Sequence, residues 1–352
     1  MKSIKSLTFL LLATLGFLIP LSEVAIRLRK GALLDFQNTL YKPQFLQSNR
    51  FLAGYPEQYD PILGWVPQSQ KELKANWGSI VKTREFGIRS NGRIFESKEQ
   101  PILALGGSFT FGDQVEDNQT WPSYLEQLAN RPILNAGVSG YGLDQIILRL
   151  ADLLHKNIVP SKVVIGVTAQ NVQLVSFSQR WGLNKPYFEF ENSHLQLKNT
   201  PIQATEKYPR LGLVRSVLGH SYFFSVLLYR LAPTYWTAGL NYKFQSLPTN
   251  TDWREVSCAL TLKLSTLLKE HHLKGLLVYQ YEKDVNEIDL EVRNHINSCA
   301  KKVNLEFFDT YPSLSSLQKN DPQKYQSFFS WHMTAAGNAF IAKQIFPKLQ
   351  NL

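Results

Sequence analysis

The spacing of hydrophobic and polar positions predicts alternating strands and helices from about residue 101 to the end of the chain. The predicted strands are 101–105, 133–135, 162–168, 275–281 and 305–309, and the predicted helices are 120–130, 144–155, 253–271, 290–302 and 334–349. Strands that alternate with helices imply βαβ units, and hence a parallel sheet covered on both faces. Ligands bind such sheets at the carboxyl ends of the strands, so we expect a site in the turns that follow them.

Two other stretches depart from this alternation. Residues 31–100 are polar and punctuated by glycine and proline, which predicts short extended pieces and an extension that packs on the α/β domain. Residues 175–248 are rich in aromatic side chains and include HSYFFSVLLYRLAPTYW. This stretch predicts an insertion in the 101–352 domain with a small core of its own, and a lid or a lipid-touching surface is the alternative.

The N-terminal segment 1–30 contains a long apolar run. Residues 7–26 are nearly all apolar, and Lys2 and Lys5 precede them. A run of about twenty such residues has the length that a bilayer needs. The one weak cleavage site ends at Ala25 and places Glu23 at its −3 position, so we predict an uncleaved signal anchor, with a cleaved signal peptide as the second interpretation. The following domain is expected on the extracytoplasmic, periplasmic side of a membrane.

Composition narrows the classes of protein. The chain has 352 residues, of which 44% are hydrophobic and 19% charged, as in folded globular proteins. The net charge of +10 would suit an anionic partner. The sequence contains no zinc-finger spacing, RNP-like motif or long Lys/Arg run, so we do not predict nucleic-acid binding. Part of the positive charge flanks the apolar N-terminal run instead.

The two cysteines, Cys258 and Cys299, both fall in predicted helices. They leave open a single disulfide or two buried thiols, and the disulfide requires the two helices to lie side by side. No CxxC or Cys/His cluster has the spacing of a structural zinc site. The sequence therefore predicts neither a metal site nor a cofactor.

Three motifs follow the predicted strands or open the last helix. Ser108 lies in the turn GGSFTFG, Gly140 lies in NAGVSGYG, and His332 lies in WHMTAAGN. A serine hydroxyl at a strand end, a glycine N–H beside it and a histidine base are the parts of an acyl-transfer site. Each motif alone also fits a purely structural role, because a serine in a turn often caps a helix and a lone histidine is often structural.

In this order, and on this α/β pattern, the three motifs resemble the SGNH/GDSL hydrolase superfamily. The resemblance covers about residues 100–175 and 250–350, and it implies a flavodoxin-like three-layer α/β/α sandwich. It implies that Ser108 is the nucleophile, that His332 is its base, and that the N–H groups of Ser108 and Gly140 bind the oxyanion. The family's next motif is usually Asn-Asp, and it corresponds here to Gln170 and Asn171, either of which offers a side-chain N–H.

Two departures from the family pattern matter for activity. Gly107 stands where the family usually has an aspartate before the serine. The family acid lies two or three residues before the histidine, where this chain has Ser330 and Phe329. Asp309 is a candidate acid from another loop. A Ser-His dyad, a displaced acid and an inactive site therefore all stay open.

The resemblance implies an enzyme that acts on acyl esters. We expect hydrolysis, or transfer of an acyl group, on an acylated envelope glycan or a lipid, with a membrane-embedded acyltransferase as a candidate partner. The alternative is a catalytically silent domain of the same fold that binds a glycan or serves as a scaffold at the membrane.

Overall fold

The structure, a computed structural model, describes residues 2–36, 38–41, 56–75, 77–93, 99–181, 183–202, 211–236, 249 and 251–352. The chain divides into two compact units. The larger unit comprises residues 54–204 and 245–352, and the smaller unit comprises residues 1–53 and 205–244. The predicted insertion at about 175–248 is thus shared between the units, because its first part, up to residue 204, belongs to the larger one.

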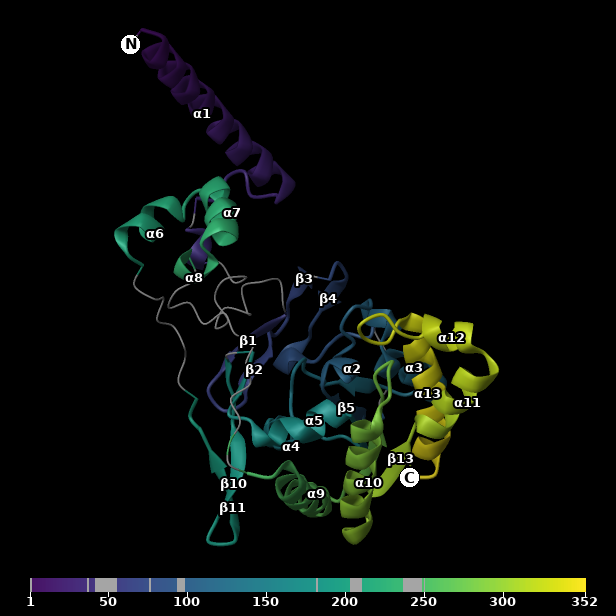
Figure 1. The fold of residues 1–352 in the computed structure, drawn as a ribbon. Coiled ribbons are helices and arrows are strands. Elements are labelled where there is room, and N and C mark those ends of the chain that lie inside the picture. Colours follow the sequence, from purple (N-terminus) through teal and green to yellow (C-terminus); the bar gives the residue numbers. More distant parts are fainter. Residues whose placement is uncertain are drawn as a thin grey trace. The chain divides into compact units, whose positions relative to one another are not determined.

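A five-stranded parallel sheet forms the centre of the larger unit (Figure 1). Its strands are β5 (Ile102–Gly106), β6 (Ile133–Asn135), β7 (Lys162–Val167), β12 (Lys274–Tyr279) and β13 (Glu306–Asp309). They lie in the order β13-β12-β7-β5-β6, with every neighbouring pair parallel. Counted along the chain, this is the flavodoxin-like order 2-1-3-4-5. The predicted parallel α/β sheet is confirmed.

Helices pack in two groups around this sheet. In one group, α3 (Trp121–Ala129) packs against α13 (Ala335–Gln350). In the other, α9 (Trp253–Glu270) packs against both α4 (Leu143–His155) and α10 (Glu287–Lys302). Both α9 and α13 also contact β12, so the sheet lies between the two groups. Each of these helices lies where the sequence predicts one, because each has an apolar stripe that the sheet buries.

Two predicted strands end earlier than expected, by one residue at Val167 and by two residues at Tyr279. The apolar run 275–281 predicts strand through Tyr281, but β12 ends at Tyr279. The N–H of Gln280 still donates to the carbonyl of Val167, at 2.8 Å. Tyr281 is held differently, since its hydroxyl donates to a carboxylate oxygen of Asp309 at 2.8 Å. The residues after Tyr279 therefore form a loop at the carboxyl edge of the sheet.

Short elements complete the larger unit. Four antiparallel hairpins join β1 (Glu57–Asp60) to β2 (Gly64–Pro67), β3 (Glu72–Lys74) to β4 (Ile80–Lys82), β8 (Gln179–Arg180) to β9 (Leu183–Asn184), and β10 (Tyr187–Glu191) to β11 (His194–Lys198). The short helices are α2 (Ser108–Phe111), α5 (Ala169–Gln173), α11 (Tyr311–Asn320) and α12 (Pro322–Ser327), with 3-10 turns η3 (Glu85–Gly87), η4 (Asp117–Gln119) and η5 (Leu174–Ser176). The first two hairpins are the extended pieces predicted before residue 100.

The smaller unit is helical. It contains α1 (Lys2–Arg29), η1 (Thr39–Tyr41), α6 (Leu213–Leu218), α7 (Tyr222–Leu231) and α8 (Pro233–Trp236). Glu23 joins α1 to α7, because its carboxylate accepts hydrogen bonds from the Ser221 hydroxyl at 2.8 Å and from the Phe223 N–H at 2.7 Å. Leu40 and Trp236 are fully buried in the core of this unit.

Among the residues whose side chains are described, no helix is at once long enough and apolar enough to span a bilayer. The predicted anchor covers residues 7–26, and the side chains of residues 7–13 and of Leu15 lie outside the described part.

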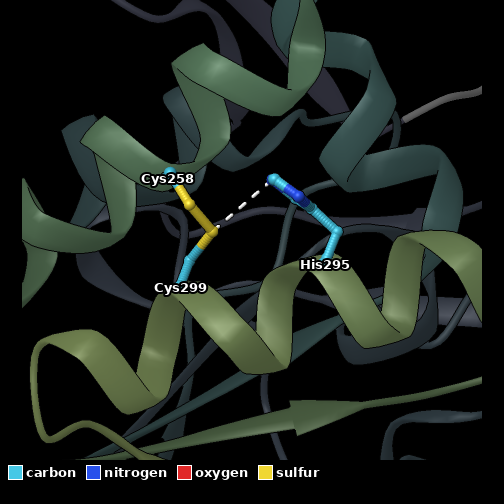
Figure 2. Close-up of side chains that lie close together, drawn as sticks. All are labelled: Cys258, His295 and Cys299. Carbon is cyan, nitrogen blue, oxygen red and sulfur yellow. Dashed lines mark hydrogen bonds between the residues drawn. A yellow bond between two sulfur atoms is a disulfide. The ribbon is translucent and has the colours of Figure 1, made fainter.

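A disulfide links two helices of the larger unit (Figure 2). Cys258 of α9 bonds to Cys299 of α10, and their Cα atoms are 5.1 Å apart. The sequence left a disulfide and two thiols open, and the structure has the disulfide. His295 lies one turn before Cys299, with its Nε2 atom 3.4 Å from the cysteine sulfur. Because the sulfurs are bonded to each other, they are not the thiolates that a metal ion would bind.

Candidate active site

The structure brings Ser108 and His332 into direct contact. Ser108 is the first residue of α2, immediately after the β5–α2 turn, and His332 lies in the loop before α13. The Oγ atom of Ser108 and the Nε2 atom of His332 are 2.9 Å apart. Both residues are half-buried, so the pair is accessible from outside. This is the distance and pairing that a histidine base needs to take the proton of a serine nucleophile.

Gln114 fastens the histidine loop to the turn that carries the serine. Its Oε1 atom accepts hydrogen bonds from the His332 N–H at 3.0 Å and from the Ser330 hydroxyl at 2.9 Å. The ring of Phe109 also lies 5.2 Å from the imidazole, measured between ring centroids. The sequence reasoning did not single out Gln114, because a glutamine in a loop carries no signal of its own.

Gly140 lies where the resemblance places an oxyanion donor. Its φ of +76° is a left-handed conformation that favours glycine. A Cβ atom built there would lie 2.1 Å from the ring of Trp181. Trp181 therefore covers this turn closely, and its ring lies 6.3 Å from that of Trp65. Only a glycine leaves room for the backbone and the indole together.

Of the two side-chain candidates for the oxyanion, Asn171 lies beside the serine turn. Asn171 is buried, whereas Gln170 is exposed. The Oδ1 atom of Asn171 accepts from the Thr168 N–H at 2.8 Å, and its Nδ2 atom donates to the Tyr141 carbonyl at 2.7 Å. A Cβ atom on Gly107 would lie 2.5 Å from that Nδ2 atom. An amide nitrogen has two hydrogens, so one remains for a ligand at the turn.

A buried arginine holds the loop that follows α2. The guanidinium of Arg89 donates to the carbonyls of Phe111 at 2.8 Å, Gly112 at 2.6 Å and Val115 at 2.7 Å. It also pairs with Asp117 at 2.9 Å. Burial lowers the pKa of Arg89, and the negative charge of Asp117 opposes this change. These contacts give the turn a fixed backbone, which a preorganised site requires.

The acid of a catalytic triad is the part that the structure does not supply directly. The Nδ1 atom of His332 is buried and has no hydrogen-bond partner among the described residues. Asp309, the candidate from the sequence, is engaged elsewhere. Its two carboxylate oxygens accept from the Tyr281 hydroxyl at 2.8 Å and from Arg293 at 2.7 Å. The structure therefore does not pair Asp309 with the imidazole.

Glu282 is a residue near the site that the sequence reasoning missed. Its side chain is exposed as a whole, but protein atoms displace part of the water around its carboxyl. This loss of water raises the pKa of Glu282 above the ordinary value. The charge of Asp289 adds to this rise, and the charges of His332 and Arg180 oppose it. The sequence gives no sign of this proximity, because Glu282 and His332 are 50 positions apart in the chain.

No family model matches this sequence, and no curated protein matches it. The chain is similar to the structure of a lipolytic protein of the G-D-S-L family from Veillonella parvula, with 12% identity and a TM-score of 0.41, over 72% of this chain and 99% of that one.

Two further solved structures are similar to the chain. One is a GDSL-like lipase from Bacteroides thetaiotaomicron, with 13% identity and a TM-score of 0.40, over 74% of this chain and 92% of that one. The other is a catalytic mutant of an acetylxylan esterase from Geobacillus stearothermophilus, with 12% identity and a TM-score of 0.41, over 73% and 96% of the two chains. These structural neighbours are GDSL-type lipolytic proteins and an acetylxylan esterase.

Proposed function

We propose that this protein is a serine esterase. The observation that carries the proposal is the 2.9 Å contact between the Ser108 hydroxyl and the His332 imidazole at the carboxyl edge of the sheet. In the first step, Oγ of Ser108 forms a bond to the carbonyl carbon of an ester, and His332 takes the hydroxyl proton. The N–H groups of Ser108 and Gly140, with the amide of Asn171, receive the negative charge that develops on the carbonyl oxygen.

The alcohol leaves before the acyl group does. His332 gives its proton to the departing alcohol, and the acyl group stays on Ser108 as an ester. Water then attacks that acyl carbon, with His332 as base, and yields a free acid. A sugar hydroxyl in place of water would yield a new ester, so the same site serves hydrolysis and acyl transfer. A membrane-embedded acyltransferase would be the natural acyl source for the second variant.

Aromatic side chains beside the site support an acylated glycan as the substrate. Trp331 directly precedes His332 and is 88% exposed. Trp181 covers the turn of Gly140 within the larger unit. The exposed ring of Trp331 offers an apolar face on which the C–H face of a sugar ring can stack.

The surface of the smaller unit supports a place at a membrane. Large apolar side chains are exposed along it: Phe17, Leu18, Leu21, Leu28, Leu33, Leu34, Phe36, Leu213, Val217 and Leu231. Basic residues lie among them in the sequence, at Lys30, Arg215 and Arg230. Apolar side chains interspersed with cations suit the boundary between acyl chains and anionic head groups. We propose that this unit rests in that boundary and that the apolar run at residues 7–26 is the anchor.

The test of the esterase is the variant Ser108→Ala, assayed with short-chain nitrophenyl esters. Turnover should fall on the order of 10⁴-fold or more, because the nucleophile is lost. Ser316→Ala, which changes an exposed serine of α11, is the matched control and should keep the parent rate. Equal turnover by Ser108→Ala and the parent protein would show that this serine is not the nucleophile.

A second candidate function is a silent binding domain, and the unpartnered Nδ1 atom of His332 favours it. Covalent labelling distinguishes the two. A fluorophosphonate should modify Ser108 in an esterase, because His332 activates its hydroxyl. A silent domain should remain unlabelled and should still bind an acylated oligosaccharide.

A further inference from the structure

The imidazole of His332 lacks the partner that an efficient serine hydrolase gives it. Its Nε2 atom contacts Ser108, while its buried Nδ1 atom has no hydrogen-bond partner among the described residues. In a triad, a carboxylate at Nδ1 fixes the tautomer that leaves Nε2 free to accept a proton. It also stabilises the imidazolium that forms during the reaction. A buried ring nitrogen without a partner is costly, so the site as described is incomplete.

Glu282 lies in the loop that is bound to the segment before the histidine. It is the third residue after β12, at the carboxyl edge of the sheet. The carbonyl of the next residue, Lys283, accepts a 2.6 Å hydrogen bond from the hydroxyl of Tyr325. Tyr325 in turn packs on Phe329, with their ring centroids 5.3 Å apart. The backbone next to Glu282 is therefore tied to the segment that leads into His332.

The carboxyl of Glu282 feels nearby charges but makes no hydrogen bond or ion pair of its own among the described residues. Within the described part of the chain, no hydrogen bond or ion pair joins its side chain to another residue. Loss of water around the carboxyl and the charge of Asp289 raise the pKa of Glu282. The positive charges of His332 and Arg180 partly oppose this rise. Asp289, whose charge acts on Glu282, already has a partner, since its carboxylate accepts from the N–H of Asn286 at 2.9 Å. Glu282 is thus a carboxylate on which the charge of His332 acts, and no hydrogen bond to another described residue holds it elsewhere.

We propose that Glu282 is the positioning acid of this site and that its carboxylate accepts the Nδ1–H of His332 during turnover. The proposal rests on the proposed esterase function. The acid would come from the loop after β12, in place of the residues just before the histidine, where this chain has Phe329 and Ser330. During the reaction the Ser108 proton moves to Nε2, the Nδ1 proton stays on the ring, and Glu282 stays ionised.

The variant Glu282→Gln tests this role by removing the charge at nearly constant shape. We expect kcat to fall about 10- to 100-fold with KM little changed, less than for a fully buried triad acid because Glu282 is exposed. The carboxylate stabilises the imidazolium, so its loss should move the acidic limb of the kcat/KM profile to lower pH. Glu282→Asp should restore part of the rate.

Asp284→Asn is the matched control. It removes the same charge from the same exposed loop, two residues further along, and should leave kcat and the acidic limb as in the parent protein. Unfolding curves of both variants should overlap with that of the parent, which separates a positioning role from a loss of fold.

The failures of the two proposals are distinguishable. If Ser108-dependent turnover persists and Glu282→Gln matches the parent in kcat and in pH profile, Glu282 is not the acid and the esterase stands. If the parent has no Ser108-dependent turnover, the esterase proposal fails. The role of Glu282 is then tested without any assay of activity, by NMR titration of the His332 imidazole in the parent and in Glu282→Gln. Identical titration curves would overturn that role.

Discussion

At the scale of single residues, the departure of Gly107 from the family pattern has a physical reason. A side chain at this position would meet the Nδ2 atom of Asn171, which a Cβ would approach to 2.5 Å. Asn171 is anchored on its other side by Thr168 and Tyr141, so it cannot easily withdraw. The small residue before Ser108 and the amide beside it therefore belong to one arrangement.

The variant Gly107→Ala tests this arrangement. It should displace the Asn171 amide and lower kcat about tenfold or more, because the loss of one oxyanion donor costs about 10²–10³ in kcat and a displaced donor keeps part of that effect. Gly107→Asp, which restores the usual family residue, should lower kcat further. Gly212→Ala is the control, since a Cβ there meets nothing within 4 Å. Parent-like rates in nitrophenyl ester assays of the Gly107 variants would contradict the crowding.

At the scale of elements, a buried ion pair connects the hairpin region to the helical layer. Lys185 and Asp144 are both fully buried and hydrogen-bonded to each other. The Lys185 ammonium also donates to the carbonyls of Phe177 at 3.1 Å and Pro186 at 2.9 Å. Burial lowers the pKa of Lys185 and raises that of Asp144, and each charge opposes the shift of the other. Because Asp144 lies in the first turn of α4, the pair ties residues 177–186 to that helix.

Removal of the lysine charge should therefore destabilise the fold. We expect Lys185→Met to lower the free energy of unfolding by about 3–5 kcal/mol, because it leaves the Asp144 carboxylate buried without its counter-ion. The double variant with Asp144→Asn should recover part of that loss. Lys198→Met, which breaks an exposed pair with Glu191, is the control and should change little. Urea unfolding measures all three, and equal midpoints for Lys185→Met and Lys198→Met would refute the expectation.

Prediction from the sequence worked best for elements whose pattern a buried sheet imposes. The strand at residues 162–167 is a continuous apolar run, and helix 143–155 has a clear apolar stripe, so both lie where expected. Helices α11 and α12 and the hairpins β8–β9 and β10–β11 were not predicted. Their residues are mixed in polarity, because they cover the sheet layers at the surface and only partly face a core.

At the scale of the whole molecule, the chain combines a unit built on a parallel sheet with a helical unit that exposes apolar side chains. The smaller unit draws on two segments far apart in the sequence, 1–53 and 205–244. Glu23 and Arg27 of α1 bind the start of α7 and the residues before it. Glu23 accepts from the Phe223 N–H at 2.7 Å, and Arg27 donates to the His220 carbonyl at 2.9 Å. The aromatic stretch of the insertion is therefore part of the same unit as the N-terminal helix.

This arrangement predicts that α6 touches lipid. The two native cysteines form a disulfide, so a fluorophore can be attached at a single introduced cysteine in the full chain. A label at Leu213→Cys, a position 81% exposed, should be strongly quenched by brominated lipids in anionic vesicles, because it lies among acyl chains. A label at Leu262→Cys on α9, an exposed apolar position of the larger unit, should remain unquenched. Equal, water-like emission at both positions would exclude the lipid contact.

The sequence by itself determined the α/β class and the parallel sheet, and it singled out Ser108, Gly140 and His332 as candidates. These follow from local signals, because apolar periodicity marks buried elements and short motifs mark the turns at strand ends. The tertiary structure alone decided the rest. It placed Asn171 instead of Gln170 beside Ser108, engaged Asp309 with Arg293, and brought Glu282 into the field of the histidine. Such contacts join residues far apart in the chain, and only the packing of the loops above the sheet determines them.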